Sequence, residues 1–435
     1  MRILLVSPYH GGSHAAWARS LQRHSRHEIE LLTLPDRFWK WRMHGGAVTL
    51  ARRWLRDGPA ADAILATDML DLTTFLALTR PATDGVPAVL YMHENQLTYP
   101  LPAAGEGGPM RRQGGERDHH YAFVNFASML AAERVVFNSR FHHDAWFEEL
   151  PRFLRHFPEH NELGAVEALR ARSSVLPVGI EAGALRRTEP TAARVSAPGP
   201  QPAGKSQPSG LGTERSPKRE DLHSTAAASR DPASAGSGTA GAPLVLWNQR
   251  WEYDKNPAQL LRALRDVADR GVAFRLAICG RPYGESPPEL AAIREAFADR
   301  LVHFGFAEDD AYRRLLGEAS IVVSTAVHEF FGIAVLEAMA AGAFAILPDR
   351  LSYPELLDGP EVGEATRERC LYDSHEGLVD RLAWGVQSPG EATRMGAELA
   401  RNARRFDWTQ VAPAYDALFE RVRRETARGD RPREQ

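Results

Sequence analysis

The most constraining feature of this chain is an alternation of short apolar runs with longer helical patterns, which occurs in two separate blocks. Such continuous apolar runs are typical of strands buried on both faces of a parallel sheet, with helices as the covering layers. In the first block we expect strands at residues 3–6, 30–34, 63–66, 88–92, 134–137 and 174–176. In the second block we expect them at residues 244–247, 275–279, 302–304, 321–324 and 344–347. The sequence therefore predicts an α/β fold with two doubly wound domains.

The two blocks are separated by a segment of different composition. Residues 190–243 consist mainly of Ala, Pro, Ser, Gly, Arg and Thr, and such a segment cannot bury enough apolar surface to offset its ordering entropy. We therefore expect an N-terminal domain at 1–189, a disordered low-complexity insertion at 190–243 and a second domain at 244–408. Apolar residues at helical spacing predict that 409–435 form a helix that crosses back to the first domain, followed by a tail.

Charge and cysteine content exclude several classes of protein. The 53 Lys and Arg residues are balanced by 56 Asp and Glu residues, so a nucleic-acid partner would need a local basic patch. The two cysteines exclude a disulfide scaffold and suit a reducing compartment. No uncharged apolar run is long enough to span a bilayer, so we expect a cytoplasmic protein without a membrane partner. The sequence carries no signal for the oligomeric state.

A pair of carboxylates marks the second domain. Glu329 and Glu337 stand eight positions apart around Gly332, which follows a buried strand where a helix should begin. Open α/β sheets bind ligands at the carboxyl ends of their strands, so both carboxylates could face one crevice. The backbone N–H groups from Gly332 through Ile333 to Ala334, next to Phe331, would then point at a diphosphate.

This stretch resembles the Glu-x7-Glu signature of the retaining, nucleotide-sugar-dependent glycosyltransferases of family four. That family has the GT-B fold, in which two Rossmann-like domains face each other across an active-site cleft. The resemblance implies that Glu329 meets the donor sugar and that Glu337 meets the ribose of the nucleotide.

Further residues match the donor site of that family. Arg250 and Lys255 have the spacing with which these enzymes hold the diphosphate, although a surface ion pair with Glu252 or Asp254 is an alternative. The sequence contains no metal-ligand cluster, and two cations can stabilise a departing diphosphate in place of a metal, so we expect no metal and no cofactor. Three glycines at strand ends complete the predicted donor site: Gly11, Gly12 and Gly280.

Other stretches narrow the resemblance to one group. Residues 34–43, 91–100, 118–126 and 137–142 closely resemble the tRNA-queuosine mannosyltransferases. The group implies transfer of mannose from GDP-mannose, with retention, to the cyclopentenediol of queuosine in the anticodon of an aspartate tRNA. The partners would be a nucleotide sugar and a queuosine-containing tRNA.

The residues of these stretches suit an RNA acceptor. Basic and aromatic side chains alternate between positions 37 and 42, and could contact the phosphates and unstacked bases of an RNA. The first sixty residues of the chain carry a net charge of +6. His93 follows a buried strand, where it could receive or relay the proton of an acceptor hydroxyl. We assign catalysis to Glu329, Arg250, Lys255 and His93. The predicted acceptor and tRNA residues are Ser13, His14, Arg37, Trp39, Lys40, Trp41, Arg42, Glu94, Asn95, His119 and Asn138.

Alternatives stay open at this point. Trp39 and Trp41 could pack in the core from a short extended stretch, with the basic residues on a solvated face. The adjacent His119 and His120 cannot converge on one ion, which argues against a zinc site. The chain could also be a family-four enzyme with a lipid, polysaccharide or small glycoside as acceptor, or a GT-B protein that binds RNA without catalysis.

Overall fold

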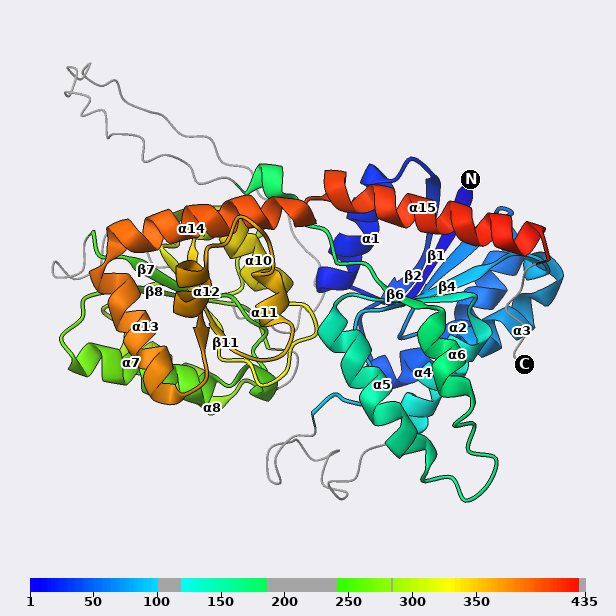
Figure 1. The fold of residues 1–435 in the computed structure, drawn as a ribbon, viewed down its shortest axis with the longest axis horizontal. Coiled ribbons are helices and arrows are strands. Elements are labelled where there is room, and N and C mark those ends of the chain that lie inside the picture. The colour runs from blue at the N-terminus through cyan, green and yellow to red at the C-terminus, as the bar shows by residue number, and fades with distance from the viewer. Residues whose placement is uncertain (101–118, 186–240, 283–284, 430–435) are drawn as a thin grey trace, which may run out of the picture.

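Two lobes, each built around its own parallel sheet, make up the protein (Figure 1). The computed structural model describes residues 1–100, 119–185, 241–282 and 285–429. The strands of the N-terminal lobe are β1 (Arg2–His10), β2 (Glu28–Pro35), β3 (Ala63–Thr67), β4 (Ala88–Met92), β5 (Arg134–Phe137) and β6 (Ser173–Val175). Those of the C-terminal lobe are β7 (Leu244–Trp247), β8 (Arg275–Cys279), β9 (Leu301–Gly305), β10 (Ile321–Val323), β11 (Phe344–Pro348) and β12 (Leu371–Tyr372).

Strand order fixes where a ligand can bind. The first sheet has the order β2-β1-β3-β4-β5-β6 and the second β12-β11-β10-β7-β8-β9. In each sheet the first strand of its lobe, β1 or β7, has later strands of the chain on both sides, so the strand order reverses beside it. A crevice forms at such a switch point, at the carboxyl ends of the strands. The residues that follow β1 and β7 therefore stand at the two crevices.

Helices cover both faces of each sheet, because the strands are buried on both sides. The N-terminal lobe carries α1 (Gly12–His24), α2 (Trp39–Asp57), α3 (Leu72–Thr83), α4 (His119–Ala131), α5 (Arg140–Leu154) and α6 (Ala165–Ala171). The C-terminal lobe carries α7 (Pro257–Asp269), α8 (Pro288–Ala296), α9 (Asp309–Glu318), α10 (Ile333–Ala340), α11 (Tyr353–Leu356), α12 (Glu364–Cys370), α13 (His375–Gln387) and α14 (Pro389–Ala403).

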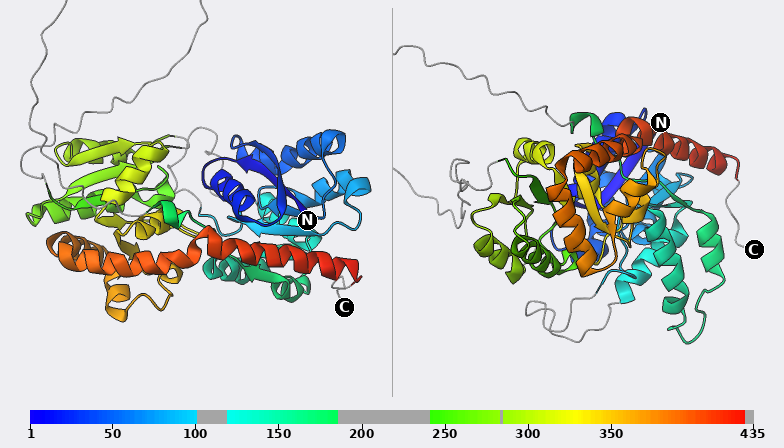
Figure 2. Two further views of the ribbon diagram at one scale, coloured as in Figure 1. Left: turned by 90° about the horizontal axis from the view of Figure 1, so that it is seen from above. Right: turned by 60° about the vertical axis from the view of Figure 1, so that its left-hand side comes forward.

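The last helix, α15 (Trp408–Ala427), returns to the N-terminal lobe as predicted. Figures 1 and 2 show α14 and α15 following one another along one side of both lobes. The side chain of Asp407 caps α15 by accepting from the backbone N–H of Thr409 at 3.0 Å. The Trp17 indole of α1 donates to the hydroxyl of Tyr415 at 3.2 Å, which ties the helix to the first lobe.

The predicted α/β fold with two facing sheets is confirmed, with local differences. β1 continues to His10, so Gly12, Ser13 and His14 lie in the first turn of α1 and not in a loop. The stretch 37–42 is not extended, because α2 begins at Trp39. The short strand β12 was not predicted from the sequence. Residues 190–240 of the predicted insertion lie outside the described residues, and the domain boundaries stay predictions. Over the ranges that are described, no helix has the length and apolar character needed to cross a membrane.

Candidate active site between the two lobes

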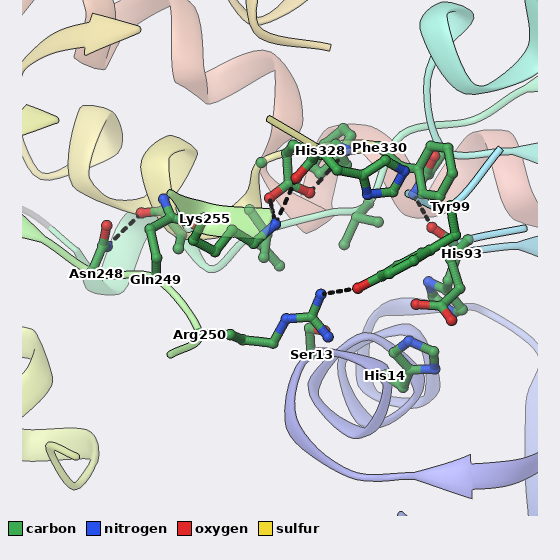
Figure 3. A pocket seen from close by; sticks show the side chains of 18 residues that line it. Ser13, His14, His93, Tyr99, Asn248, Gln249, Arg250, Lys255, His328 and Phe330 are labelled. Atoms are coloured by element: carbon green, nitrogen blue, oxygen red, sulfur yellow. Dashed lines mark hydrogen bonds and ion pairs between the residues drawn. The ribbon is translucent and has the colours of Figure 1, made fainter. Parts of the chain in front are cut away.

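A cavity of about 270 Å³ lies between the lobes at the carboxyl ends of both sheets (Figure 3). Its N-terminal wall consists of Ser13, His14, His93, Glu94, Tyr99, Asn138 and Val178. Its C-terminal wall consists of Asn248, Gln249, Arg250, Lys255, His328, Glu329, Phe330, Phe331, Gly332, Ile333 and Ala334. The cavity thus brings together the predicted catalytic residues Glu329, Arg250, Lys255 and His93.

The predicted helix start at Gly332 forms one side of the cavity. Gly332 is the N-cap of α10 with a φ of 92°, a left-handed conformation that L side chains rarely adopt. Asn248, after β7, donates to the carbonyl of Ala334 at 2.7 Å and fixes this first turn. The N–H groups of a first helical turn have no partner within the helix, and together with the helix dipole they favour an anion.

The buried Lys255 and the partly buried Glu329 form an ion pair on the C-terminal wall. Lys255 ends a 3₁₀ turn (Tyr253–Lys255), and its Nζ lies 3.2 Å from Glu329 and 3.1 Å from Asp254. Burial by itself raises the pKa of Glu329, but Lys255 and Arg250 outweigh it, so that pKa lies below its usual value. Burial lowers the pKa of Lys255, and Glu329 and Asp254 outweigh it in turn, so that pKa is raised. Both groups are therefore charged near neutral pH.

Arg250 reaches across the cavity toward the first lobe. Its Nη2 donates to the hydroxyl of Tyr99 at 3.4 Å, as the dashed line in Figure 3 shows, and its Nε lies 3.4 Å from Glu252. The ion pairs of Arg250 with Glu252 and of Lys255 with Asp254 therefore both exist, yet the two cations also line the cavity. The ion pairs therefore do not remove either cation from the cavity wall.

Glu337 lies away from the cavity surface. It stands on α10, and its carboxylate accepts a hydrogen bond of 2.8 Å from the hydroxyl of Tyr312. The same hydroxyl accepts from the side chain of Asn248 at 3.0 Å, and Asn248 lines the cavity. Burial raises the pKa of Glu337 to about 7. The two carboxylates of the motif therefore have different surroundings, and only Glu329 lines the cavity.

Two imidazole rings lie together on the N-terminal wall. His14 and His93 stack at 4.3 Å, and the edge of Trp17 packs against His93 at 4.6 Å. Asn138 donates to the carbonyl of His93 at 2.8 Å. In the described chain the Nε2 of His93 and the Nδ1 of His14 have no hydrogen-bond partner. Burial lowers the pKa of His14 to about 4 and moves that of His93 in the same direction, so both rings are neutral near pH 7.

Several residues of the site were not predicted from the sequence. Asp68 follows β3, is 1 % exposed and accepts from the backbone N–H of His93 at 2.9 Å. The only signal in the sequence is its place directly after a buried strand. The other lining residues to which the sequence assigned no role are Tyr99, Val178, Asn248, Gln249, His328 and Phe330.

The lobes also meet beside the cavity. The ring of His142, at the start of α5, stacks on Phe330 at 3.9 Å. The hydroxyl of Ser139 donates to the Phe330 carbonyl at 2.5 Å, and the backbone N–H of Phe141 donates to Glu355 at the same distance. The loop that carries Glu329 is therefore packed against the first lobe.

Some predicted site residues do not line the cavity. Asn95 is fully buried, and its side-chain Oδ1 accepts hydrogen bonds from the backbone N–H groups of residues 97 and 98, so this side chain shapes the local turn. A side chain at Gly280 would collide with the Gln249 carbonyl, so this glycine permits a close approach of two loops. Gly11 and Gly12 lie at the start of α1, before the lining residue Ser13. His119 lines a separate groove with residues of α5.

The basic and aromatic residues at 37–42 are partly exposed. Trp41 is 63 % exposed and Phe38 79 %, so neither packs in the core. Trp39 is partly buried, with its ring 5.2 Å from Tyr121, so the core alternative holds in part for Trp39 and is wrong for Trp41. A side chain at Gly11 would collide with Asp36, which shows that this segment lies beside the start of α1.

Both lobes of the chain are similar to known proteins. Residues 2–180 match the family described as tRNA-queuosine alpha-mannosyltransferase N-terminal, and residues 234–403 match Glycosyl transferases group 1. A tRNA-queuosine alpha-mannosyltransferase of Drosophila melanogaster is 29 % identical over 422 residues, which cover 96 % of each chain. A GDP-mannose:cellobiosyl-diphosphopolyprenol alpha-mannosyltransferase of Xanthomonas oryzae is 29 % identical over 42 % of this chain and 48 % of its own.

Solved structures share the fold. HepE of Anabaena, in complex with UDP and glucose, has a TM-score of 0.58 at 16 % identity and covers 97 % of this chain and 99 % of its own. A sucrose-phosphate synthase of Thermosynechococcus elongatus has a TM-score of 0.63 at 13 % identity, with the same coverage of both chains.

Fold, cavity and family matches together define the class: the chain is a nucleotide-sugar glycosyltransferase with the GT-B fold. Each lobe matches a glycosyltransferase family model, and one relative is similar over nearly the full length of the chain. Within that class, the N-terminal lobe matches the tRNA-queuosine alpha-mannosyltransferase family, and nearly the whole chain is similar to one such enzyme.

Proposed function

We propose that this protein transfers mannose from GDP-mannose, with retention, to the cyclopentenediol of queuosine in the anticodon of an aspartate tRNA. The proposal is supported by the N-terminal lobe, which matches the tRNA-queuosine family over residues 2–180, and by the near full-length similarity to the fly enzyme. The observation that carries the chemistry is the ion pair of buried Lys255 with partly buried Glu329, 3.2 Å apart, on the wall of a cavity between the two lobes.

On the donor side, the C-terminal wall supplies the positive charge. The diphosphate would lie against Arg250, Lys255 and the N-terminus of α10, where charge develops as the sugar–phosphate bond breaks. Glu329 is ionised because Lys255 holds its pKa down, so it can accept hydrogen bonds from hydroxyls of the sugar. We assign Glu337 to the ribose, which it would reach beside Tyr312 and Asn248.

On the acceptor side, His93 would receive the reacting hydroxyl. Its Nε2 has no partner among the described residues, and its lowered pKa keeps the ring neutral and able to accept a hydrogen bond. A ring with a lowered pKa is a weak base, so the proton would pass to the departing diphosphate on the same face of the sugar. Attack from that face gives retention.

The tRNA would extend from the cavity onto the 37–42 segment. The exposed rings of Phe38 and Trp41 could stack on unpaired bases, and Arg37, Lys40 and Arg42 could meet phosphates. We propose the cytoplasm as the location, in agreement with the reducing compartment that the two free cysteines suit.

The test is a transfer assay with total tRNA from queuosine-containing cells. Incubation with GDP-mannose should add one hexose mass to the queuosine nucleoside of aspartate tRNA, and tRNA from cells without queuosine should give no product. Other sugar nucleotides tested in parallel would establish the donor. Product with a lipid or a glycan, and none with queuosine tRNA, would contradict the proposal.

A further inference from the structure

Negative charge predominates in the cavity and its surroundings. Among the described residues, the charged groups that interact there electrostatically are the cations of Arg250 and Lys255 and the carboxylates of Glu94, Glu252, Asp254 and Glu329. Burial raises the pKa of the nearby Asp68 well above its usual value, so its carboxyl is not counted as a charge. A nucleotide sugar adds its own negative charge, so the donor alone leaves the site further from neutrality.

Most of these carboxylates have a partner within the protein. Asp254 and Glu329 pair with Lys255 at 3.1 and 3.2 Å, and Glu252 pairs with Arg250 at 3.4 Å. Asp68 accepts the backbone N–H of His93 and does not line the cavity. The remaining carboxylate is Glu94, which lines the cavity directly.

Glu94 faces the acceptor half of the site without a salt-bridge partner in the described chain. Its side chain accepts one hydrogen bond, of 3.0 Å, from the neutral amide of Gln96. It follows His93 at the end of β4, so it stands on the wall opposite to the Glu329 loop. Burial raises the pKa of Glu94, and Arg250 opposes that shift. Because donor phosphates compete for Arg250, a bound donor leaves this carboxylate in need of another cation.

We propose that Glu94 determines acceptor specificity by pairing with a cationic amine that the acceptor carries next to its reacting diol. This inference rests on the proposed function, since queuosine joins its cyclopentenediol to the base through a secondary amine. That amine is protonated near neutral pH and lies close to the hydroxyl that His93 would receive. A charge-assisted hydrogen bond from amine to carboxylate would orient the diol and balance the charge of the site.

The experiment varies the acceptor and the enzyme together. Three anticodon stem-loop RNAs carry queuosine, queuosine N-acetylated at the secondary amine, or queuosine N-methylated there. Acetylation removes the charge and methylation keeps it with similar added bulk. The enzymes are wild type, Glu94→Gln and the matched control Glu167→Gln, whose carboxylate on α6 has an 84 % exposed side chain.

For wild type and Glu167→Gln we expect acetylation to lower kcat/KM at least tenfold, roughly the effect of losing one charged hydrogen bond, and methylation to lower it little. With the native acceptor, kcat/KM of Glu94→Gln should be lower than that of wild type by about the same factor. Acetylation of the acceptor should not lower kcat/KM of this variant any further. Its affinity for GDP should be at least that of wild type, because Glu94 no longer competes with the phosphates for Arg250, and retained GDP binding also shows that the variant is folded.

The outcomes separate the two levels of the proposal. If Glu94→Gln still discriminates between the methylated and acetylated acceptors, or loses its GDP affinity, the role of Glu94 is wrong while mannosyl transfer to queuosine stands. If wild type gives no product with any queuosine RNA, the proposed function and the amine recognition are both overturned.

Discussion

The two walls of the cavity differ in how they handle charge. The C-terminal wall contains two cations, the exposed Arg250 and the buried Lys255, and its ion pairs keep Glu329 ionised. The N-terminal wall, as far as it is described, contains two imidazole rings that burial keeps neutral and one carboxylate, but no Lys or Arg side chain.

This difference separates two tasks that need different electrostatics. A leaving diphosphate is stabilised by fixed positive charge, whereas an attacking hydroxyl needs a neutral hydrogen-bond acceptor that does not hold it as an anion. Because each wall comes from its own lobe, donor and acceptor recognition can be changed independently. The following predictions test that division, from the largest expected effect to the smallest.

Lys255→Ala should lower kcat/KM roughly 1,000-fold, because it removes a preorganised cation from the leaving group. It also leaves Asp254 and Glu329 without their partner, so thermal unfolding should show a loss of about 3–5 kcal/mol. The double variant Lys255→Met, Asp254→Asn should regain part of the stability, because only Glu329 is then left without its partner, but it should not regain transfer. Wild-type turnover by either variant would remove Lys255 from the mechanism.

Glu337→Gln should change the pH dependence of stability in the donor-free protein. The pKa of Glu337 is raised from 4.5 to about 7, so the folded state binds more protons than the unfolded state between these values. Wild type therefore loses about 3 kcal/mol as pH rises from about 4.5 to about 7, and the variant does not. Urea unfolding at pH 5 and pH 8 measures this. Equal pH profiles for both proteins would contradict the buried, neutral state of Glu337.

His93→Asn should lower kcat with queuosine tRNA roughly 100-fold, since it replaces the ring that receives the acceptor hydroxyl. The affinity for GDP, measured by calorimetry, should stay within about twofold, because the donor contacts lie on the other wall. A parallel loss of GDP affinity would show that the two walls are not independent.

Trp41→Ala should raise KM for tRNA roughly tenfold, the effect of losing one base stacked on an aromatic ring, and leave kcat unchanged. The matched control is Leu78→Ala, which truncates an exposed apolar side chain on α3 of the same lobe. With the free queuosine nucleoside as acceptor, Trp41→Ala should have the same KM and kcat as wild type. An unchanged KM for tRNA would place the anticodon elsewhere.

Most of the fold could be predicted from local sequence. Apolar runs such as 88–92 and 244–247 have one stable environment, the middle of a parallel sheet, so composition alone identifies them as strands. The spacing of Val411, Tyr415 and Phe419 likewise identified the last helix, since a helix buries positions three to four apart. Strand β12, with two residues, was missed because so short a run carries no pattern.

The site was predicted as far as it lies in motifs. Arg250, Lys255, Glu329 and Gly332 occupy fixed positions after strands, so their meeting at the carboxyl edge follows from the chain order. The sequence could not distinguish the environments of Glu329 and Glu337, because a pKa depends on which groups burial brings near. Only the fold puts Lys255 next to one carboxylate and Tyr312 next to the other.

By itself, then, the sequence determined the two-lobed α/β architecture and the residue types that could hold a sugar nucleotide, because both depend on local pattern. Tertiary structure alone decided the pairing of partners distant in the chain: His14 on His93, Arg250 against Tyr99, and Asp68 beneath the His93 backbone. The reason is physical: charge state and hydrogen bonding depend on distances of a few ångströms, which only packing of the two lobes fixes.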